Sequence, residues 1–203
     1  MKKIGILFGS FNPVHNGHLM AGNWLAENTD LDEVWFSLTP SNRFKDSNDY
    51  LHYEDRNLLL AKALEDSYNC DKLSRTTFEE SLKPPYYTID SLDYVSSLYN
   101  EAEFCLIIGA DEFLLLDEWM NADRLKRTYP IYVVPRLGYK INKQEVRLLE
   151  YKELHIIDEK NGYPLNKISS TFIRRELKNR RNISYYIPRK EYEAIVDYNM
   201  YRS

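Results

Sequence analysis

Cysteine is scarce in this sequence, which contains only Cys70 and Cys105 among its 203 residues. The two cysteines stand in unrelated contexts and form neither a CxxC pair nor a spacing typical of a metal site. A disulfide framework and a zinc module are therefore excluded as the basis of the fold. Isolated cysteines of this kind are typical of reduced thiols, and they indicate a cytoplasmic protein.

Long apolar runs and an excess of basic residues are also missing. No early stretch is apolar for long enough to be a signal peptide or a membrane span, so we expect a cytoplasmic protein that does not enter a membrane. The formal net charge of −4 argues against a general nucleic-acid binder, and any anion site must be a local basic pocket. A chain of this length can bury one sizeable core, so we expect residues 1–203 to form a single domain. Assembly into a homo-oligomer stays open.

Two glycine-rich phosphate motifs are absent as well. The first loop contains Gly5-x-x-x-Gly9 and lacks the GxGxxG spacing of a dinucleotide-binding turn. No GxxxxGK[ST] segment occurs, which excludes a P-loop kinase or NTPase. The motifs also include no Ser-His-Asp triad and no pair of catalytic carboxylates.

The most informative segment that is present is GSFNPVHNGH, at positions 9–18. It follows an apolar run at 4–8 that predicts a buried strand, and it precedes a helix predicted over 19–26. Open parallel sheets bind ligands where a strand ends and a helix begins, and the helix start offers unpaired N–H groups and a partial positive charge. Glycines let a phosphate approach the backbone, and His15 and His18, one helical turn apart, can donate to its oxygens. The segment therefore predicts a phosphate site.

A second segment, ISSTFIRR at positions 168–175, has the composition of an anion-binding helix start. Serine and threonine before an apolar periodic segment are helix N-caps, and a simple cap is an equally good interpretation of the segment alone. Arg174 in the first turn is unfavourable for the helix dipole unless an anion lies between it and the helix start. Each hydrogen bond to a charged group contributes roughly 1.5–3 kcal/mol, so converging hydroxyl, N–H and guanidinium groups could hold a triphosphate.

Strand-like and helix-like segments alternate along the chain. The strand-like segments after the first are 31–38, 73–77, 104–108, 131–134 and 155–157, and the helix-like segments after the first are 58–64, 88–98, 170–178 and 189–198. Such alternation predicts βα units joined by right-handed crossovers, with helices on both faces of a parallel sheet. The fold class that we expect is α/β, with a Rossmann-like doubly wound parallel sheet.

Taken together, the GSFNPVHNGH and ISSTFIRREL segments resemble the nucleotidylyltransferase superfamily, and specifically the bacterial nicotinate-nucleotide adenylyltransferases. The resemblance covers essentially the whole chain. The family's opening motif commonly reads GGTFDPxHxGH, and Phe8, Ser10 and Asn12 stand here in place of its first glycine, its threonine and its aspartate. The resemblance implies a doubly wound sheet of the nucleotidylyltransferase type with a small helical C-terminal part.

Other segments resemble the family as well. Lys45 corresponds to a basic residue in a loop of the family, and Arg56 corresponds to an arginine in a helix of the family. Tyr87-Thr88-x-Asp90 resembles the family's YTxDT segment, and Ile107 to Asp111 with Trp119 resembles its IIGAD…W segment. Pro135-Arg136 resembles its KRPG-like loop.

The resemblance implies transfer of the adenylyl group of ATP to nicotinate mononucleotide, giving nicotinate adenine dinucleotide and pyrophosphate. Mg²⁺ would arrive on the ATP phosphates, since no cluster of protein ligands for a metal is evident. The residues implied for catalysis are His15, His18 and Arg174. Those implied for ATP are Gly9, Ser10, Phe11, His15, Gly17, His18, Gly109, Asp111, Ser169, Ser170, Thr171 and Arg174, and those implied for the acceptor are Lys45, Tyr87, Thr88, Trp119 and Arg136.

Several alternatives stay open. The acceptor could be the amidated mononucleotide or another phosphorylated molecule such as phosphopantetheine, or the pocket could belong to a nucleotide-binding regulator without catalysis. A histidine pair at helical spacing is more often structural than functional. Asp111 could be a helix cap, Trp119 could be a core residue, and Lys45 and Arg136 could be solvated loop charges.

Overall fold

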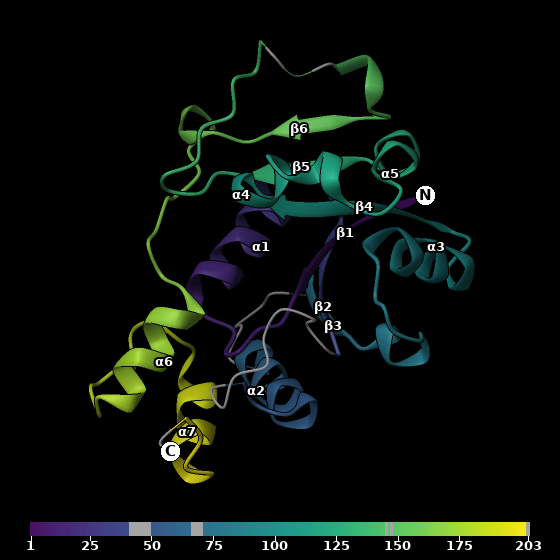
Figure 1. The fold of residues 1–203 in the computed structure, drawn as a ribbon. Coiled ribbons are helices and arrows are strands. Elements are labelled where there is room, and N and C mark those ends of the chain that lie inside the picture. Colours follow the sequence, from purple (N-terminus) through teal and green to yellow (C-terminus); the bar gives the residue numbers. More distant parts are fainter. Residues whose placement is uncertain (41–49, 66–70, 145, 147, 202–203) are drawn as a thin grey trace.

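In the described part of the chain, six parallel strands form one sheet in the order β3-β2-β1-β4-β5-β6 (Figure 1). The structure is a computed structural model, and it describes residues 1–40, 50–65, 71–144, 146 and 148–201. The strands are β1 (Lys2–Gly9), β2 (Glu33–Leu38), β3 (Leu73–Thr76), β4 (Ala102–Gly109), β5 (Ile131–Val134) and β6 (Leu154–Ile156). The expected α/β fold class with a doubly wound parallel sheet is confirmed.

The order of the strands explains where a ligand can bind. β1 pairs with β2 on one side and with β4 on the other, so the chain crosses to the opposite side of β1 between β3 and β4. Open sheets bind ligands outside the carboxyl ends of the strands at such a switch point. The segment at positions 9–18 begins at this point.

Helices cover both faces of the sheet. The α-helices are α1 (Asn16–Asn28), α2 (Tyr53–Glu65), α3 (Thr88–Leu98), α4 (Ala110–Phe113), α5 (Ala122–Thr128), α6 (Ser170–Lys178) and α7 (Arg189–Asp197), with short 3₁₀ helices η1 (Phe78–Ser81), η2 (Leu116–Glu118), η3 (Leu148–Glu150) and η4 (Glu159–Asn161). Among the described residues, no helix is both long and apolar enough to cross a membrane.

β4 shows how the sequence builds two cores at once. Cys105 and Ile107 join the core cluster that α1 and α2 cover, whereas Phe104, Leu106 and Ile108 join the cluster under α3, α4 and α5. A strand that is buried on both faces has a continuous apolar sequence, because successive side chains point to opposite faces. This continuous run made β4 the clearest strand in the sequence.

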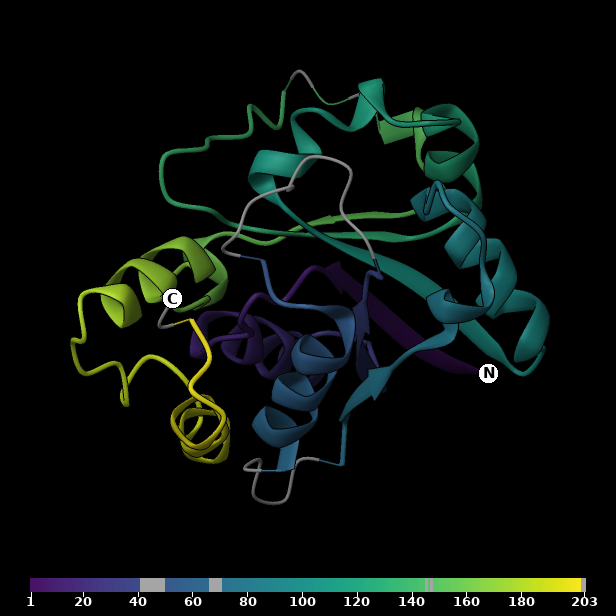
Figure 2. The ribbon, with the colours of Figure 1, turned by 60° about the horizontal axis from the view of Figure 1, so that its bottom comes forward.

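α6 and α7 lie apart from the two helical layers and form the small C-terminal part that the resemblance implied (Figures 1 and 2). Leu59 of α2 joins Ile173 of α6 and Ile195 of α7 in a third core cluster. This packing attaches α6 to the body of the protein through α2.

Several predicted boundaries differ from the observed ones. The bounds of α3, β5 and α6 are those predicted, but α1 begins at Asn16 and α2 at Tyr53, earlier than the apolar residues indicated. Apolar periodicity marks the part of a helix that faces the core, whereas first turns are often polar. α2 carries Glu54 and Asp55 in its first turn, where acidic side chains stabilise a helix.

Candidate active site

A cavity of about 650 Å³ lies at the carboxyl ends of β1, β4 and β5, beside the first turns of α1, α3 and α6. Apart from Lys45, every site residue named from the sequence lines this cavity: Gly9, Ser10, Phe11, His15, Gly17, His18, Tyr87, Thr88, Gly109, Asp111, Trp119, Arg136, Ser169, Ser170, Thr171 and Arg174. Lys45 lies outside the described residues. The fold thus brings together five stretches of chain that are far apart in the sequence.

His15 and His18 cap α1 reciprocally. The His18 backbone N–H donates to Nδ1 of His15, and the His15 backbone N–H donates to Nδ1 of His18, each at 3.3 Å. This arrangement is a capping box in which two imidazoles replace the usual hydroxyl and carboxylate. Because each Nδ1 accepts a hydrogen bond, the neutral form of each ring carries its proton on Nε2. In each neutral ring the N–H donor is therefore Nε2.

The environment of His15 keeps its ring neutral. His15 is 2% exposed, and burial lowers the pKa of its imidazole to about 3, with the positive charge of Arg136 as a second cause. The rings of His15 and His18 stack with their centroids 3.6 Å apart, and Phe11 packs edge-on against His18 at 5.2 Å. An uncharged His15 allows this stack to form without repulsion between two imidazolium ions.

Gly17 is required by the close packing around the histidines. A Cβ atom at this position would lie 2.7 Å from Oδ1 of Asn166 and 3.0 Å from Nδ1 of His15. Any side chain at position 17 would therefore displace the His15 ring or the Asn166 amide. The glycine in HxGH thus provides room for the capping imidazole.

The first turn of α1 differs from the open row of N–H donors expected from the sequence. The Asn16 N–H donates to the Tyr186 carbonyl at 2.9 Å, and the His18 N–H also donates to the His15 carbonyl at 2.8 Å. Cap formation satisfies these N–H groups within the protein. The capping arrangement uses Nδ1 of both imidazoles as acceptors, so the donor of each neutral ring at this end of the cavity is Nε2.

The start of α6 docks directly onto the loop that follows β1. Ser169 is the N-cap of α6 and accepts from the Phe172 N–H at 3.2 Å. Ser170 Oγ donates to the Pro13 carbonyl at 2.7 Å, and Arg174 Nη1 donates to the Asn12 carbonyl at 2.7 Å. The second motif therefore both lines the cavity and holds the first motif in place.

Arg174 retains donor capacity after these contacts. Its Nη2 lies 3.3 Å from Oγ1 of Thr171, and its Nε is buried without a hydrogen-bond partner among the described residues. The buried Nε–H without such a partner costs free energy, whereas Nη2 carries two N–H groups and keeps one donor beyond its contact with Thr171. The sequence alone indicated an anion here, and this geometry agrees with that interpretation.

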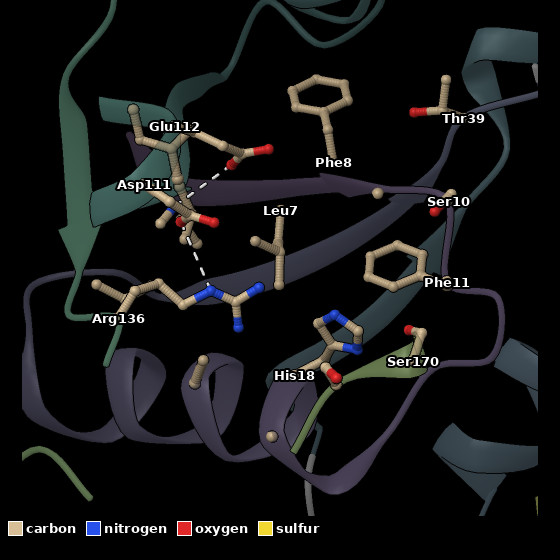
Figure 3. Close-up of a pocket in the computed structure, with 18 of the residues that line it drawn as sticks. Leu7, Phe8, Ser10, Phe11, His18, Thr39, Asp111, Glu112, Arg136 and Ser170 are labelled. Carbon is tan, nitrogen blue, oxygen red and sulfur yellow. Dashed lines mark hydrogen bonds and ion pairs between the residues drawn. The ribbon is translucent and has the colours of Figure 1, made fainter. Parts of the chain in front are cut away.

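A third wall comes from the end of β4 and the loop after β5. Nε of Arg136 pairs with Oδ1 of Asp111 at 3.5 Å, and the guanidinium extends into the cavity from this pair (Figure 3). A Cβ atom on Gly109 would lie 2.3 Å from the same Asp111 oxygen, so a side chain at position 109 would displace the Asp111 carboxylate. The Gly109 N–H donates to Oε2 of Glu112 at 3.4 Å, which makes Glu112 the capping carboxylate of α4. Asp111 is therefore free of the helix-cap role considered above.

The start of α3 and Trp119 line another part of the cavity. Tyr87 is the N-cap residue of α3, and its side chain makes no capping hydrogen bond to the first turn. Such a helix start carries a partial positive charge that a ligand anion can use. Trp119 follows η2, packs partly against the core under α3 and also lines the cavity. The core and ligand interpretations of Trp119 are therefore compatible.

Several residues that line the cavity were not predicted. Pro84, Pro85 and Tyr86 immediately precede the Tyr87-Thr88 segment, so their position in the sequence was a usable signal. Tyr163 and Asn166 lie in an irregular segment before α6, and no motif marks either of them. Only the folded chain brings these two residues to the cavity.

Known proteins resemble this chain over almost its whole length. The family model for cytidylyltransferase-like proteins matches residues 6–176. The chain is 38% identical over 199 residues to the Cytophaga hutchinsonii protein named "Probable nicotinate-nucleotide adenylyltransferase", with 98% of both chains covered. It is also 38% identical to the Bacteroides fragilis protein of the same name, with 96% of this chain and 91% of the relative covered.

The fold is also similar to that of a solved enzyme. The nicotinic acid mononucleotide adenylyltransferase of Plasmodium falciparum, complexed with NaAD, aligns with a TM-score of 0.80 over 99% of this chain and 98% of the other. At 20% sequence identity, this likeness shows the fold alone. On the family match and the full-length relatives, the chain belongs to the cytidylyltransferase-like family and, within it, to the nicotinate-nucleotide adenylyltransferases.

Proposed function

We propose that this protein transfers the adenylyl group of ATP to the phosphate of nicotinate mononucleotide, giving nicotinate adenine dinucleotide and pyrophosphate. The observation that carries the proposal is the shared cavity. The capping histidines and the start of α6 border one part of it, and the start of α3 with Trp119 borders another. A cavity with these two parts can hold a polyphosphate and a pyridine nucleotide at the same time. Full-length relatives with the matching name support the same reaction.

The nucleophile needs little help from a general base. The second pKa of a phosphate monoester is near 6, so the acceptor phosphate is largely ionised at pH 7. One of its oxygens forms a bond to the α-phosphorus of ATP, while the bond from that phosphorus to the oxygen bridging to the β-phosphate breaks. Pyrophosphate leaves with the electron pair of the broken bond. The protein contributes positioning and stabilisation of charge during this in-line displacement.

The phosphate chain of ATP would lie between the histidines and α6. His18 donates from Nε2 to an oxygen of the α-phosphate, and His15 donates to a neighbouring phosphate oxygen. The hydroxyl groups of Ser169 and Thr171, with the guanidinium of Arg174, bind the β- and γ-phosphates and stabilise pyrophosphate as it leaves. Ser170 supports this wall by holding the Pro13 carbonyl.

The adenosine part would lie along the end of β4. The Asp111 carboxylate accepts hydrogen bonds from ribose hydroxyl groups, and Gly109 lets the nucleoside approach the backbone. Arg136 holds the Asp111 carboxylate from the other side and brings its own positive charge toward the phosphates. This pairing orients the carboxylate before a nucleotide arrives.

The acceptor would place its pyridine ring against Trp119, with its carboxylate at the start of α3. Because Tyr87 provides no side-chain cap, the first turn of α3 can bind a negatively charged group. The amidated ring carries no such charge. This feature favours the acidic mononucleotide over its amide.

Mg²⁺ enters this reaction as part of the substrate. Among the described residues, no group of three or more histidine, cysteine, aspartate and glutamate side chains is arranged to hold a metal ion. Mg²⁺ commonly binds through substrate phosphates and keeps several waters. Bound to ATP, it would neutralise part of the charge on the phosphates.

Release of pyrophosphate from ATP tests the proposal. The purified protein is given Mg·ATP with nicotinate mononucleotide, with phosphopantetheine or with no acceptor, and both products are quantified. We expect equal amounts of pyrophosphate and nicotinate adenine dinucleotide with the mononucleotide and no pyrophosphate otherwise. Preferential use of phosphopantetheine would contradict the assigned acceptor. ATP binding without turnover on any acceptor would indicate a nucleotide-binding regulator and overturn the enzymatic proposal.

A further inference from the structure

Arg56 is a buried cation for which the reaction described above has no role. It lies in the first turns of α2, is 1% exposed, and is absent from the described residues that line the cavity. The rings of Tyr50 and Tyr53 flank its guanidinium at 4.7 Å and 5.6 Å. A buried guanidinium is costly unless its N–H groups are satisfied, so its partners indicate why the chain retains it.

The recorded partners of Arg56 are backbone carbonyl groups. Nη1 donates to the Ser10 carbonyl at 2.7 Å and to the Thr39 carbonyl at 3.1 Å. Nη2 donates to the Pro40 carbonyl at 2.9 Å, and Nε donates to the Leu51 carbonyl at 3.1 Å. One side chain thus joins the loop after β1, the end of β2 and the segment that leads into α2.

Two further contacts join the same segments. The Thr39 N–H donates to the Gly9 carbonyl at 3.0 Å, and the Leu51 N–H donates to Oδ1 of Asn12 at 3.3 Å. Arg56 therefore lies at the centre of a set of bonds that fixes positions 9 to 12. The loop is held from behind by α2, while Arg174 and Ser170 hold its next carbonyl groups from α6.

The direction of the Ser10 carbonyl matters for an anion site. Ser10 and Thr39 line the cavity, whereas Arg56 lies behind them. A carbonyl oxygen bonded to this guanidinium points away from the cavity. If the oxygen pointed into the cavity, its partial negative charge would repel a phosphate. A guanidinium can satisfy several carbonyl groups in a fixed planar geometry, which an ammonium group cannot do.

We propose that Arg56 is a positioning residue for ATP binding. Its side chain holds the loop after β1 so that the carbonyl groups of the loop point away from the phosphates. This inference rests on the proposed function insofar as ATP is the ligand of the cavity. Arg56 acts through Ser10 and Thr39, and it touches neither the nucleotide nor the acceptor.

Calorimetric titration with a non-hydrolysable ATP analogue tests the inference without needing turnover. We expect Arg56→Lys to weaken binding of the analogue by about 10- to 100-fold, because a lysine cannot hold all four carbonyl groups. In Arg56→Ala, millimolar guanidinium should restore part of the affinity, and the same concentration of methylammonium should not. A side chain that merely stabilises the fold would not respond to the planar cation in this selective way.

Leu125→Ala is the matched control for lost stability. Leu125 is fully buried in α5, and no residue of that helix lines the cavity in the described part of the chain. We expect this variant to lose thermal stability but to bind the analogue like the parent protein. Unchanged affinity in folded Arg56→Lys would overturn the inference, as would an equal loss of affinity in Leu125→Ala. If Arg56→Ala does not fold, Arg56→Lys decides the question alone. A parent protein that binds ATP but forms no dinucleotide would contradict the proposed function and leave this test intact.

Discussion

At the scale of single residues, the site depends on the tautomers of two histidines. Sequence spacing places His15 and His18 one helical turn apart, but it does not show that each ring caps the other's backbone. The reciprocal cap orients both rings through Nδ1 and leaves Nε2 as the donor of each neutral ring. In their neutral forms, both rings can then donate from Nε2 to phosphate oxygens.

His18→Ala should lower kcat by about 10²–10³-fold, the scale of losing one donor to a developing charge. The variant keeps Gly17 and the His15 ring, so binding of ATP should fall much less than turnover. Steady-state kinetics with ATP and nicotinate mononucleotide measures both. His155→Ala is the control, because that ring stacks on Tyr132 and belongs to β6, away from the cavity. A loss of less than tenfold in His18→Ala would remove His18 from the chemistry.

The buried state of His15 predicts a pH-dependent stability. Its pKa is about 3 in the folded protein against an ordinary value of 6.5, so between these values the unfolded chain binds more protons than the folded one. The free energy of unfolding should therefore fall as pH falls from 6.5 toward 3, with a slope of up to about 1.4 kcal/mol per pH unit from this group.

His15→Asn isolates this contribution. Asparagine is a good N-cap residue and does not titrate in this range, so the variant should show a smaller loss of stability toward acid pH. Urea denaturation at a series of pH values gives the comparison. Parallel stability curves for the parent and variant proteins would mean that the buried state of His15 has no energetic effect.

At the scale of secondary-structure elements, helix starts provide the electrostatics of the site. α3 starts beside the cavity without a side-chain cap, and α6 begins with Ser169 and docks on the loop after β1. Because each helix start is positive, the cavity favours negative groups at both places. The net charge of −4 is compatible with such a site, since the positive potential is local.

The start of α3 predicts the choice between acid and amide. A hydrogen bond to a charged group contributes roughly 1.5–3 kcal/mol, so kcat/KM for nicotinate mononucleotide should exceed that for the amide by about 10- to 100-fold. Rates with the two mononucleotides, measured side by side under the same conditions, give this ratio. Equal or faster use of the amide would show that the start of α3 does not read the pyridine substituent.

The contact between α6 and the loop after β1 can be tested with Ser170→Ala. Loss of the hydrogen bond to the Pro13 carbonyl should lower the free energy of unfolding by about 1 kcal/mol. Because α6 also binds phosphates in our proposal, kcat/KM for ATP should fall about tenfold. Ser97→Ala removes a comparable hydroxyl, which bonds to the Tyr94 carbonyl within α3, and should leave kcat/KM unchanged. Equal kcat/KM for ATP in Ser170→Ala and Ser97→Ala would contradict the role of the start of α6 in binding phosphates.

Most elements could be predicted from the sequence, because their signals are local. The continuous apolar run of β4 and the periodicity of α3 depend on residues that are neighbours in the chain. Most motif residues reach one cavity because they follow strand ends or lie at the starts of helices. The role of Arg56 could not be predicted, since its four carbonyl partners come from three segments that meet only in the folded protein. Tyr163 and Asn166 were missed for the same reason.

At the scale of the whole molecule, the order of the strands and the C-terminal part together complete the site. The switch point between β1 and β4 places the first motif and Asp111 side by side, and the core cluster shared by α2, α6 and α7 brings the second motif to them. Tyr201, near the end of the chain, donates to Oδ1 of Asn12 at 2.7 Å and adds a last attachment. Asn12, which replaces the family's aspartate, thus has a structural role in this chain. The single-domain organisation stays a prediction.

The most direct test of this account is a crystal structure of the protein with a non-hydrolysable ATP analogue and Mg²⁺. We predict that an α-phosphate oxygen lies about 3 Å from Nε2 of His18. In the same complex, oxygens of the two outer phosphates should lie at hydrogen-bond distance from Arg174 and from the hydroxyl groups at the start of α6. A triphosphate bound to only one of these two walls, with the other facing solvent, would contradict the claim that the histidines and α6 hold a single polyphosphate between them.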